Sequence, residues 1–418
     1  MKPFLVCIIV GLVLSGCSGF ALQPVAFAYQ DAHSPTSAPT PSIISAPETF
    51  VPETQAVIQA TEDNPQPPPE VAPSPTPGSN AYNYSYGPYY FPPNINPLTG
   101  LPVINQNLLE RRPIVIKVTN FPRSVRPQYG LSLADHVYEY YIGDSMSRFI
   151  GIFYGNDASR VGPIRSARLF DEHVMRMYEG IFIFGWADDP VLEFLLADDL
   201  KSHLIIERSD SCPPLCRIGP KGAYNTLYAN TAEVGAYLSR RGTNNDRQKL
   251  WGLRFDVAVP KSGNPGNLLY LDYSAVSYHY WEYDQSSGRY LRFQDTVDAL
   301  GQTEKQYEPL IDNLTGRQLA ADNVIVLKVL HTYYYRSKST EILDQPLLGE
   351  GIGYAFRNGN IYPITWSQEK PNRLLEFKLP NGATYALKPG TVWFEIIGET
   401  SEFEPDADGA YRYTFSIP

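Results

Sequence analysis

The chain has 418 residues, a net charge of −10 at pH 7 and six histidines. Residues 94–418 alone carry 33 basic and 38 acidic residues. This acidic balance and the lack of a basic run argue against nucleic acid as a partner and against a polybasic membrane patch. The histidines are scattered singly, without metal-ligand spacing, so we expect no bound metal and no cofactor.

The chain begins with a segment typical of export. An early lysine precedes an apolar stretch from Phe4 to Leu14, which is too short to span a bilayer permanently. Cys17 follows Leu-Ser-Gly, a pattern that resembles the bacterial lipobox and implies that Cys17 carries diacylglycerol. We therefore expect a lipoprotein signal over residues 1–17. The acylated Cys17 would hold the protein to a lipid bilayer, on the outer face of the cytoplasmic membrane or the periplasmic face of an outer membrane. The alternative is plain secretion, with cleavage near residues 26–28.

A proline-rich acidic segment follows over residues 18–93. It holds six acidic residues and no Lys or Arg, and it shows no sustained helical or strand period. Such a composition cannot bury enough apolar surface to offset its ordering entropy, so we expect a disordered tether. A flexible coil of this length spans about 50 Å. The tyrosine-rich stretch at its end, "AYNYSYGPYYFPP", is either the sticky end of a linker or an element that binds sugar or wall polymer.

Strand-like and helix-like segments alternate over residues 94–250. The expected strands are 111–120, 134–142, 147–155, 181–186 and 203–209, where β-branched and aromatic residues are dense. The expected helices are 166–180 with Ser166 as cap, 189–200 with a proline in its first turn, and 230–242 ending at glycine. This order predicts an α/β domain with a mixed sheet covered by helices.

Alternation with a period of two dominates residues 251–418. We expect hairpins over 274–293, 353–366 and 374–397, the last two turning at Asn-Gly, and one long strand over 323–337. The predicted fold class is therefore α+β, with the α/β domain followed by an antiparallel β-rich domain. Each part is expected to have a core of its own, with an exposed joint near residues 240–248.

Two cysteines remain in the exported part, Cys212 and Cys216. They enclose two prolines and a leucine, and an exported pair so close together indicates a local disulfide. A zinc site would need two further ligands, which are not at hand. A redox-active pair is the remaining alternative.

Several motifs together resemble the YerB-like family of bacterial lipoproteins. They are "NPLTGLP", "RRPIVIKVTNFPRSVRPQYGLSLADHVYEYYI", "SRFIGIFYG", "VGPIRSAR", "GAYNTLY" and "LKPGTVWFEII". The resemblance covers nearly all of residues 94–398 and implies two adjoining domains of unknown function, without naming a reaction. The family usually has Pro-His-Asn where this chain has Ala-Tyr-Asn at 223–225, so only Asn225 carries over and a catalytic histidine at 224 is excluded. The segment "YIGDSMS" before the strand at 147 also departs from the family pattern.

The motif "VGPIRSAR" raises the question of an anion site. Arg165 and Arg168 flank Ser166 where a strand-like run turns into a helix, and Arg148 on a neighbouring strand could converge with them. The candidate anion ligands are Arg148, Arg165, Ser166, Arg168 and Asn225. Guanidinium groups near a helix N-terminus suit phosphate or carboxylate. The structural alternative pairs these arginines with three acidic residues in the same domain, namely Asp135, Glu139 and Asp171.

Two functions of different class remain open. No nucleophile elbow, phosphate loop or zinc-protease motif is present. We therefore favour a non-catalytic envelope lipoprotein that binds an anionic glycan, a wall polymer or a partner protein. The alternative is a transferase acting on a polyprenyl-pyrophosphate-linked sugar or another phosphate-containing envelope substrate, with the arginines on the pyrophosphate and a divalent ion bound. The arginine layout is similar to that of the cell-wall polymer ligases of the LytR-CpsA-Psr type, whose signature sequences are absent.

Overall fold

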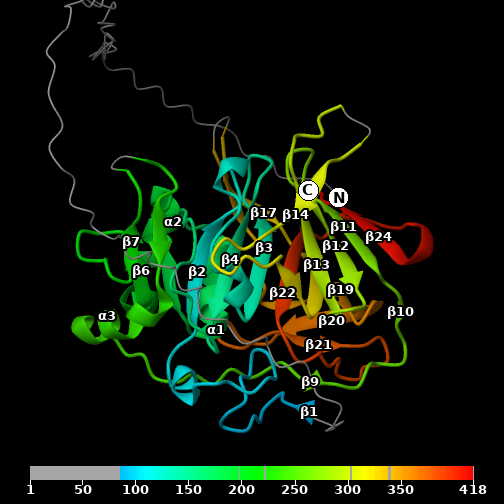
Figure 1. Cartoon of the computed structure of the whole chain (residues 1–418), viewed down its shortest axis with the longest axis horizontal. Helices are drawn as coiled ribbons and strands as arrows, with labels where there is room; N and C mark the ends of the chain where they lie inside the picture. The colour runs from blue at the N-terminus through cyan, green and yellow to red at the C-terminus, as the bar shows by residue number, and fades with distance from the viewer. Residues whose placement is uncertain (1–84, 197, 221–222, 302–303, 338–339, 418) are drawn as a thin grey trace, which may run out of the picture. The chain divides into compact units, whose positions relative to one another are not determined.

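The computed structural model describes residues 85–417, apart from 197, 221–222, 302–303 and 338–339 (Figure 1). The predicted signal, Cys17 and most of the tether lie outside the described residues. Three α-helices are present among those described: α1 (Leu169–Tyr178), α2 (Asp189–Leu196) and α3 (Val234–Arg241). Short 3-10 helices span Gln106–Glu110, Arg123–Val125, Leu131–Leu133, Asp198–His203, Thr231–Glu233 and Ala407–Gly409.

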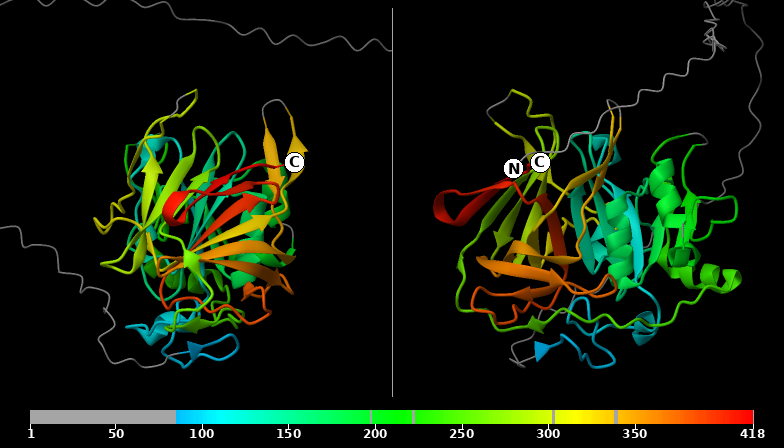
Figure 2. Two further views of the ribbon diagram at one scale, coloured as in Figure 1. Left: turned by 90° about the vertical axis from the view of Figure 1, so that its right-hand side faces the viewer. Right: turned by 180° about the vertical axis from the view of Figure 1, so that it is seen from behind.

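An eleven-stranded sheet contains strands from both halves of the chain (Figure 2). Their order is β10-β20-β19-β16-β22-β3-β4-β2-β5-β6, with β21 on β20. Its strands before residue 250 are β2 (Ile114–Thr119), β3 (His136–Tyr141), β4 (Ser147–Phe153), β5 (Ile181–Phe184) and β6 (Leu204–Ile206). Those after residue 250 are β10 (Asn264–Pro265), β16 (Asn323–Val329), β19 (Gly349–Arg357), β20 (Asn360–Gln368), β21 (Glu376–Lys378) and β22 (Val392–Gly398). The halves meet where β22 pairs in parallel with β3.

A seven-stranded sheet is built only from residues after 250, in the order β14-β13-β12-β11-β24-β23, with β15 on β13. Its strands are β11 (Leu268–Asp272), β12 (Tyr278–Asp284), β13 (Arg289–Asp295), β14 (Tyr307–Pro309), β15 (Ala320–Ala321), β23 (Glu402–Pro405) and β24 (Ala410–Thr414). Three two-stranded pairs complete the described part: β1 (Ser85–Tyr86) with β9 (Phe255–Asp256), β7 (Leu215–Arg217) with β8 (Leu227–Ala229), and β17 (Thr332–Arg336) with β18 (Glu341–Asp344).

The large sheet is covered on both faces, which explains why its central strands are buried at nearly every position. Side chains alternate across a strand, so Tyr138 and Tyr140 of β3 share a core with α1 and α2, whereas Val137 faces the opposite core. That opposite core contains residues of the seven-stranded sheet and of α3. Parallel strands buried on both faces are expected to be apolar throughout.

The predicted fold class is confirmed, because the described chain has few helices and many strands in mixed and antiparallel sheets. Four local expectations need correction. The expected hairpin over 374–397 does not form over that length, because β21 pairs with β20 while β22 pairs with β16 and β3. The two halves share their cores, because β3 and β22 are neighbours in one sheet. The expected strand over 323–337 is interrupted after Val329, and β16 and β17 belong to different sheets. Helix α1 begins at Leu169, so Ser166 is not its cap. The predicted joint at 240–248 stays a prediction.

Candidate functional site

The segment from Gly162 to Arg168 lies as an extended chain at the carboxyl ends of β2 and β5. Thr119 N donates to Pro163 O at 2.9 Å, at the end of β2. Gly185 N, just after β5, donates to Arg165 O at 3.1 Å, and Ile164 N donates to Leu227 O at 2.8 Å. The carboxyl ends of parallel strands in such sheets are where ligands commonly bind. The backbone of the motif is thus held in place from three sides.

Gly162 permits this close packing. Its φ is +141°, and a Cβ atom there would lie 3.0 Å from Leu227 O. Only glycine combines that backbone angle with such a near carbonyl. The glycine of "VGPIRSAR" is therefore needed to bring the motif against β8.

Three arginines gather at this edge, and we call Arg148, Arg165 and Arg168 the arginine cluster. Arg148, the second residue of β4, lies opposite Thr119, and its Nη1 donates to Ser166 O at 2.9 Å. All three side chains are half-buried. Burial, together with the charges of Arg168 and Arg165, lowers the pKa of Arg148, so the three guanidinium groups lie within electrostatic reach of one another.

The arginine cluster has few partners of its own. Among the described residues Arg165 has no side-chain hydrogen bond or ion pair, and burial lowers the pKa of its guanidinium. The Nε atoms of Arg165 and Arg168 are buried without an acceptor. Arg168 Nη1 lies 3.5 Å from Asp188 Oδ2, whose side chain is half exposed, and such surface pairs contribute little. The cluster therefore holds a surplus of positive charge and of hydrogen-bond donors.

The carboxylates proposed as structural partners are occupied elsewhere. Asp135 accepts from Asn96 Nδ2 and from the backbone N–H groups of Tyr154 and Gly155. Glu139 accepts from Arg292, Ser147 and Asn120. Asp171 accepts from Lys117, from Tyr140 and from the backbone of Arg168, which leaves α1 capped by its own third residue. The structural pairing of the arginines with these three residues is thus not formed.

A buried lysine lies beneath the arginine cluster. Lys117 of β2 is fully buried, and its Nζ contacts Asp171 Oδ1 at 2.9 Å and the hydroxyl of Tyr140. Burial lowers the pKa of Lys117 to about 7, with a further lowering from Arg148 and Arg168 that the Asp171 charge opposes. Lysine was not predicted here, although a single lysine inside the apolar run "IVIKVT" was a visible signal.

Ser166 lies between Arg165 and Arg168 in the chain, and Asn225 lies two residues before Leu227, whose carbonyl accepts from Ile164 N. Neither side chain bonds to the arginine cluster among the described residues. Asn225 has a φ of +61° and precedes β8, and its Oδ1 is buried without a donor. Ser166 contributes its carbonyl to Arg148. Large apolar side chains on adjoining segments are exposed: Trp186, whose carbonyl accepts from Ala167 N, is 54% exposed, Ile218 45% and Tyr224 85%. The surroundings therefore combine unpaired cations with exposed aromatic surface.

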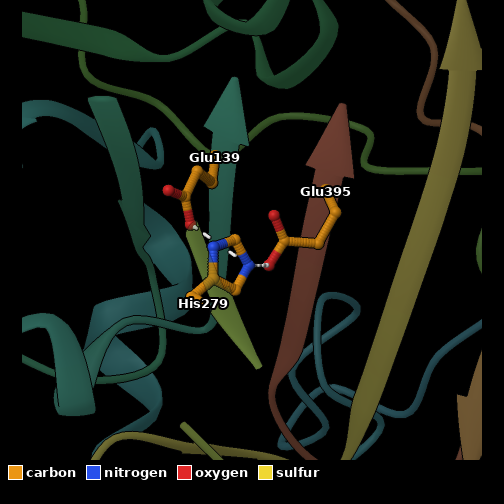
Figure 3. A group of neighbouring side chains, drawn as sticks. All are labelled: Glu139, His279 and Glu395. Atoms are coloured by element: carbon orange, nitrogen blue, oxygen red, sulfur yellow. Dashed lines mark hydrogen bonds and ion pairs between the residues drawn. The ribbon is translucent and has the colours of Figure 1, made fainter. Parts of the chain in front are cut away.

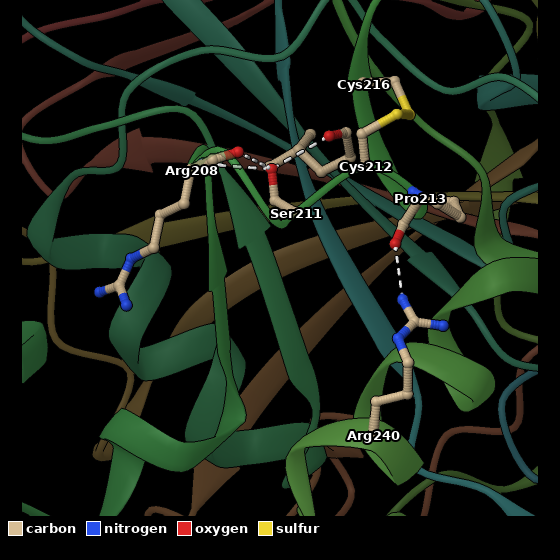
Figure 4. The surroundings of a disulfide bond; sticks show 7 residues. Arg208, Ser211, Cys212, Pro213, Cys216 and Arg240 are labelled. Atoms are coloured by element: carbon tan, nitrogen blue, oxygen red, sulfur yellow. Dashed lines mark hydrogen bonds between the residues drawn. A yellow bond between two sulfur atoms is a disulfide. The ribbon is translucent and has the colours of Figure 1, made fainter.

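A disulfide joins Cys212 and Cys216 at the base of the β7–β8 hairpin (Figure 4). Ser211 Oγ donates to Arg208 O, and Arg240 of α3 donates to Pro213 O at 3.2 Å. The small covalent ring thus fixes the hairpin whose second strand supports the arginine segment through Leu227.

A second charged cluster lies between the two sheets, and we call Glu139, His279, Arg292 and Glu395 the inter-sheet cluster. Figure 3 shows three of them, Glu139, His279 and Glu395. All four side chains are fully buried. Arg292 Nη2 lies 2.6 Å from Glu139 Oε2, and its Nη1 lies 3.1 Å from Glu395 Oε1. His279 Nε2 lies 2.9 Å from Glu395 Oε1.

The inter-sheet cluster does not fit a metal ion. Ligand atoms of Glu139, His279 and Glu395 lie within 4.8 Å of one another, but the Arg292 guanidinium already occupies both carboxylates. A cation would have to displace it from a site without solvent access. Burial and Arg292 lower the pKa of His279 to about 3, and burial raises that of Glu395 to about 7. We therefore interpret this cluster as structural.

Sequence reasoning missed the inter-sheet cluster, although the signal was present. Glu139 and Glu395 each stand alone inside an apolar run, in "HVYEYYI" and "VWFEII". A glutamate in a strand buried on both faces needs a buried partner. That partner, Arg292, belongs to another sheet, and nothing in the spacing of the residues predicts the pairing.

Comparisons with known proteins identify relatives along most of the chain. Residues 98–244 match the N-terminal domain, and residues 269–394 the C-terminal domain, of a family described as protein of unknown function DUF3048. "Putative lipoprotein YerB" of Bacillus subtilis (strain 168) is 27% identical over 327 residues, which are 75% of this chain and 87% of that protein. The crystal structure of YerB protein from Bacillus subtilis matches 72% of this chain and 96% of that chain with a TM-score of 0.60 at 22% identity, a likeness of fold. The resemblance predicted from the motifs is confirmed.

Proposed function

We propose that this chain, which belongs to the DUF3048 family through both of its domains, is a lipid-anchored envelope protein that binds an anionic ligand at the arginine cluster. The ligand is a phosphate-bearing wall polymer, an anionic glycan or an acidic surface of a partner protein. All three present negatively charged oxygen atoms. Guanidinium groups bind such anions through paired N–H donors.

The anchor in this proposal is acylated Cys17. A relative is named a putative lipoprotein, which supports attachment to a membrane outside the cytoplasm. Searching the described residues for a helix both long and apolar enough to cross a membrane finds none. Each buried methylene of an acyl chain contributes about 0.8 kcal/mol to membrane binding, so two or three chains hold the protein firmly. The side of the envelope on which it stands belongs to the proposal: the outer face of the cytoplasmic membrane, or the periplasmic face of an outer membrane.

The observation that carries the proposal is the missing negative charge at the arginine cluster. Three guanidinium groups are half-buried beside one another, while the nearby Asp171 is saturated by Lys117, Tyr140 and a backbone N–H. Like charges held together at partial burial raise the free energy of the empty site. A bound phosphate would offset that repulsion and satisfy the free Nε donors.

Binding is favoured over catalysis because the groups suited to proton transfer near the arginine cluster are enclosed in the core, while the half-exposed carboxylate of Asp188 is paired with Arg168. Lys117 and Tyr140, whose chemistry would suit proton transfer, are fully buried. A general base must lie within hydrogen-bond reach of its substrate, directly or through one water. The arginines themselves stay protonated at neutral pH and act as donors only.

A transferase is the second candidate, and one observation favours it. The exposed side chains of Trp186 and Tyr224 lie on segments adjoining the arginine cluster, where they could contact the lipid or sugar portion of a polyprenyl-pyrophosphate substrate. Asp188 could then share a divalent ion with the pyrophosphate. Incubation with a polyprenyl-pyrophosphate-linked glycan and Mg²⁺ decides between the candidates: a transferred or released glycan, lost in Arg165→Ala, would establish the enzyme.

The binding proposal is tested by thermal melting of the full-length protein in detergent micelles, with and without pyrophosphate at fixed ionic strength. We expect pyrophosphate to raise the melting temperature of the wild type, since a hundredfold excess over the dissociation constant adds about 2.7 kcal/mol to the free energy of unfolding. Arg165→Ala and Arg168→Ala should each abolish this increase.

Arg317→Ala serves as the matched control, because Arg317 is exposed in a turn and has no side-chain partner among the described residues. It should keep the full response to pyrophosphate. If both cluster variants lose stability by about 3–5 kcal/mol and the wild type ignores pyrophosphate, the arginines are structural and the proposal fails.

A further inference from the structure

A cleft lies where β19 begins and β20 ends, and none of its lining residues belongs to the arginine cluster. Its volume is about 940 Å³, near the upper end of the range for small-molecule sites. Its lining is mixed, with two aromatic rings, three carboxylates and cationic groups: Tyr89, Trp251, Glu350, Glu369, Arg373 and Glu376. The cleft is thus large enough and polar enough for an extended hydrophilic ligand.

Tyr89 and Trp251 form the aromatic side of the cleft. Their rings meet edge to face with centroids 6.1 Å apart, and Tyr89 is 62% exposed. Tyr90 beside it is 74% exposed and lines a smaller pocket, which Tyr89 and Trp251 also line. The structure thus presents aromatic side chains to solvent at the end of the tyrosine-rich stretch, where the sequence suggested sugar binding as one possibility.

The backbone holds these rings in a fixed position. Gly87 N donates to Tyr90 O at 3.0 Å, and Gly252 N donates to Pro88 O at 3.2 Å. Leu374 N donates to Trp251 O at 3.1 Å, which joins the aromatic side to the loop after β20. The Nε2 of Gln368 donates to Arg373 O at 2.9 Å and keeps that loop closed. A ligand would therefore meet a preorganised surface, which lowers the entropic cost of binding.

Carboxylates stand at the edges of the rings. Tyr89 OH donates to Glu376 Oε1 at 3.2 Å, and the Arg373 guanidinium lies 4.5 Å from the centroid of Trp251. Glu350 and Glu369 are exposed and have no ion-pair partner among the described residues. The cleft thus offers acceptors for hydroxyl donors next to apolar ring faces.

We propose that this cleft binds a neutral oligosaccharide, as a site separate from the arginine cluster. The C–H face of a sugar ring packs on an aromatic side chain, while its hydroxyls donate to carboxylates and accept from cations. An anionic ligand is disfavoured, because three carboxylates outnumber Arg373 and Lys378 in the lining. The protein would then bind a neutral glycan in this cleft and an anionic group at the arginine cluster.

The test is calorimetric titration of the full-length protein in detergent micelles with chitohexaose, cellohexaose and maltohexaose. At least one of these neutral hexasaccharides should bind, and Tyr89→Ala and Trp251→Ala should each weaken that binding at least tenfold. Glu376→Gln, which keeps the shape and removes the charge, should weaken it as well. Tyr334→Ala is the matched control, because Tyr334 is 60% exposed on a different hairpin. Melting curves show which variants remain folded.

The outcomes separate this inference from the proposed function. Arg165→Ala should leave the hexasaccharide affinity unchanged, and pyrophosphate should not compete with the glycan. The inference is overturned if none of the three sugars binds, if binding survives Tyr89→Ala in folded protein, or if pyrophosphate displaces the sugar. None of these results decides the proposed function, which depends on the loss of the pyrophosphate response in Arg165→Ala and Arg168→Ala.

Discussion

The large sheet carries two groups of buried or half-buried charged side chains. The charges of one group are paired with one another, and those of the other are not. In the inter-sheet cluster, Arg292 is fully buried and bonded to both Glu139 and Glu395. In the arginine cluster, Arg165 is half-buried and has no partner among the described residues. Charges that are buried and paired define a structure. Charges that are accessible and left unpaired at some cost are candidates for binding.

The clusters also differ in the parts of the chain that supply them. Glu139 comes from β3, before residue 250, while Arg292 and Glu395 come from strands after it. The arginine cluster lies wholly between residues 148 and 168. The inter-sheet cluster therefore belongs to the contact between the two halves, and the arginine cluster belongs to one half alone.

The largest effect should follow from separating the halves. A fragment of residues 251–418 would expose the edge of β22 that pairs with β3 and would leave Arg292 without Glu139. An uncovered apolar strand edge with a buried unpaired charge is not a stable surface. We therefore expect this fragment to lack a cooperative melting transition by circular dichroism.

Co-expression with residues 85–250 is the control for the fragment, since it should restore the transition. A fragment of 251–418 that melts cooperatively alone would show that the shared sheet is dispensable, and the two clusters would then differ less than the structure implies. Limited proteolysis of the whole chain should locate the joint between the two halves, and we expect cleavage between residues 240 and 248.

The next effect concerns Arg292→Met. This change should lower the free energy of unfolding by about 3–5 kcal/mol, because it strands two buried carboxylates close together. Urea denaturation measures the loss. Adding Glu395→Gln should recover part of it by removing one of the charges, and failure of that second change to help would contradict the electrostatic explanation.

The elements of the fold followed from local pattern more readily than its assembly did. β2, β3, β4 and β5 were predicted where they lie, because runs such as "IVIKV" and "IFIF" are short, apolar and β-branched or aromatic. The Asn-Gly turn at 358–359 was visible for the same local reason, as both residues adopt positive φ. The pairing of β3 with β22 spans about 250 residues of sequence, and nothing local specifies it.

The candidate site was predictable in part. Arg148, Arg165 and Arg168 were predicted to converge, because a strand start and a helix start at the same sheet edge bring them together. The alternative pairing of these arginines with Asp171 was wrong, because Asp171 forms its ion pair with Lys117 of β2. Side-chain competition of this kind depends on tertiary distances, which sequence spacing does not contain.

A smaller effect should appear with pH, through Lys117 beneath the arginine cluster. Its pKa of about 7 in the folded protein lies below the ordinary value of 10.5, so the unfolded chain binds more protons between those values. Stability from this residue therefore rises with pH above 7, by at most about 1.4 kcal/mol per pH unit. Asp171, Arg148 and Arg168 are the charged groups that act on its pKa, and the Tyr140 hydroxyl contacts its Nζ.

The measurement is the difference in unfolding free energy between wild type and Lys117→Met from pH 7 to pH 9. Lysine contributes a rising slope that methionine lacks. A bound anion favours the protonated lysine, so stabilisation by pyrophosphate should weaken over the same pH range in the wild type. Parallel stability curves for the two proteins would contradict the lowered pKa.

The smallest effect is expected from Arg165→Gln in the absence of any ligand, and it is the sharpest contrast with Arg292. Arg165 makes no ion pair among the described residues and adds to the positive charge that lowers the pKa of Arg148. Removing it loses no attractive contact and relieves some repulsion. The change in unfolding free energy should thus stay within about 0.5 kcal/mol, in either direction, as for ordinary surface changes. Urea denaturation beside Arg292→Met in one buffer compares the two arginines directly. A loss of several kcal/mol for Arg165→Gln would mean that this guanidinium stabilises the edge of the sheet. Arg165 would then be a structural residue like Arg292, and not part of an anion site.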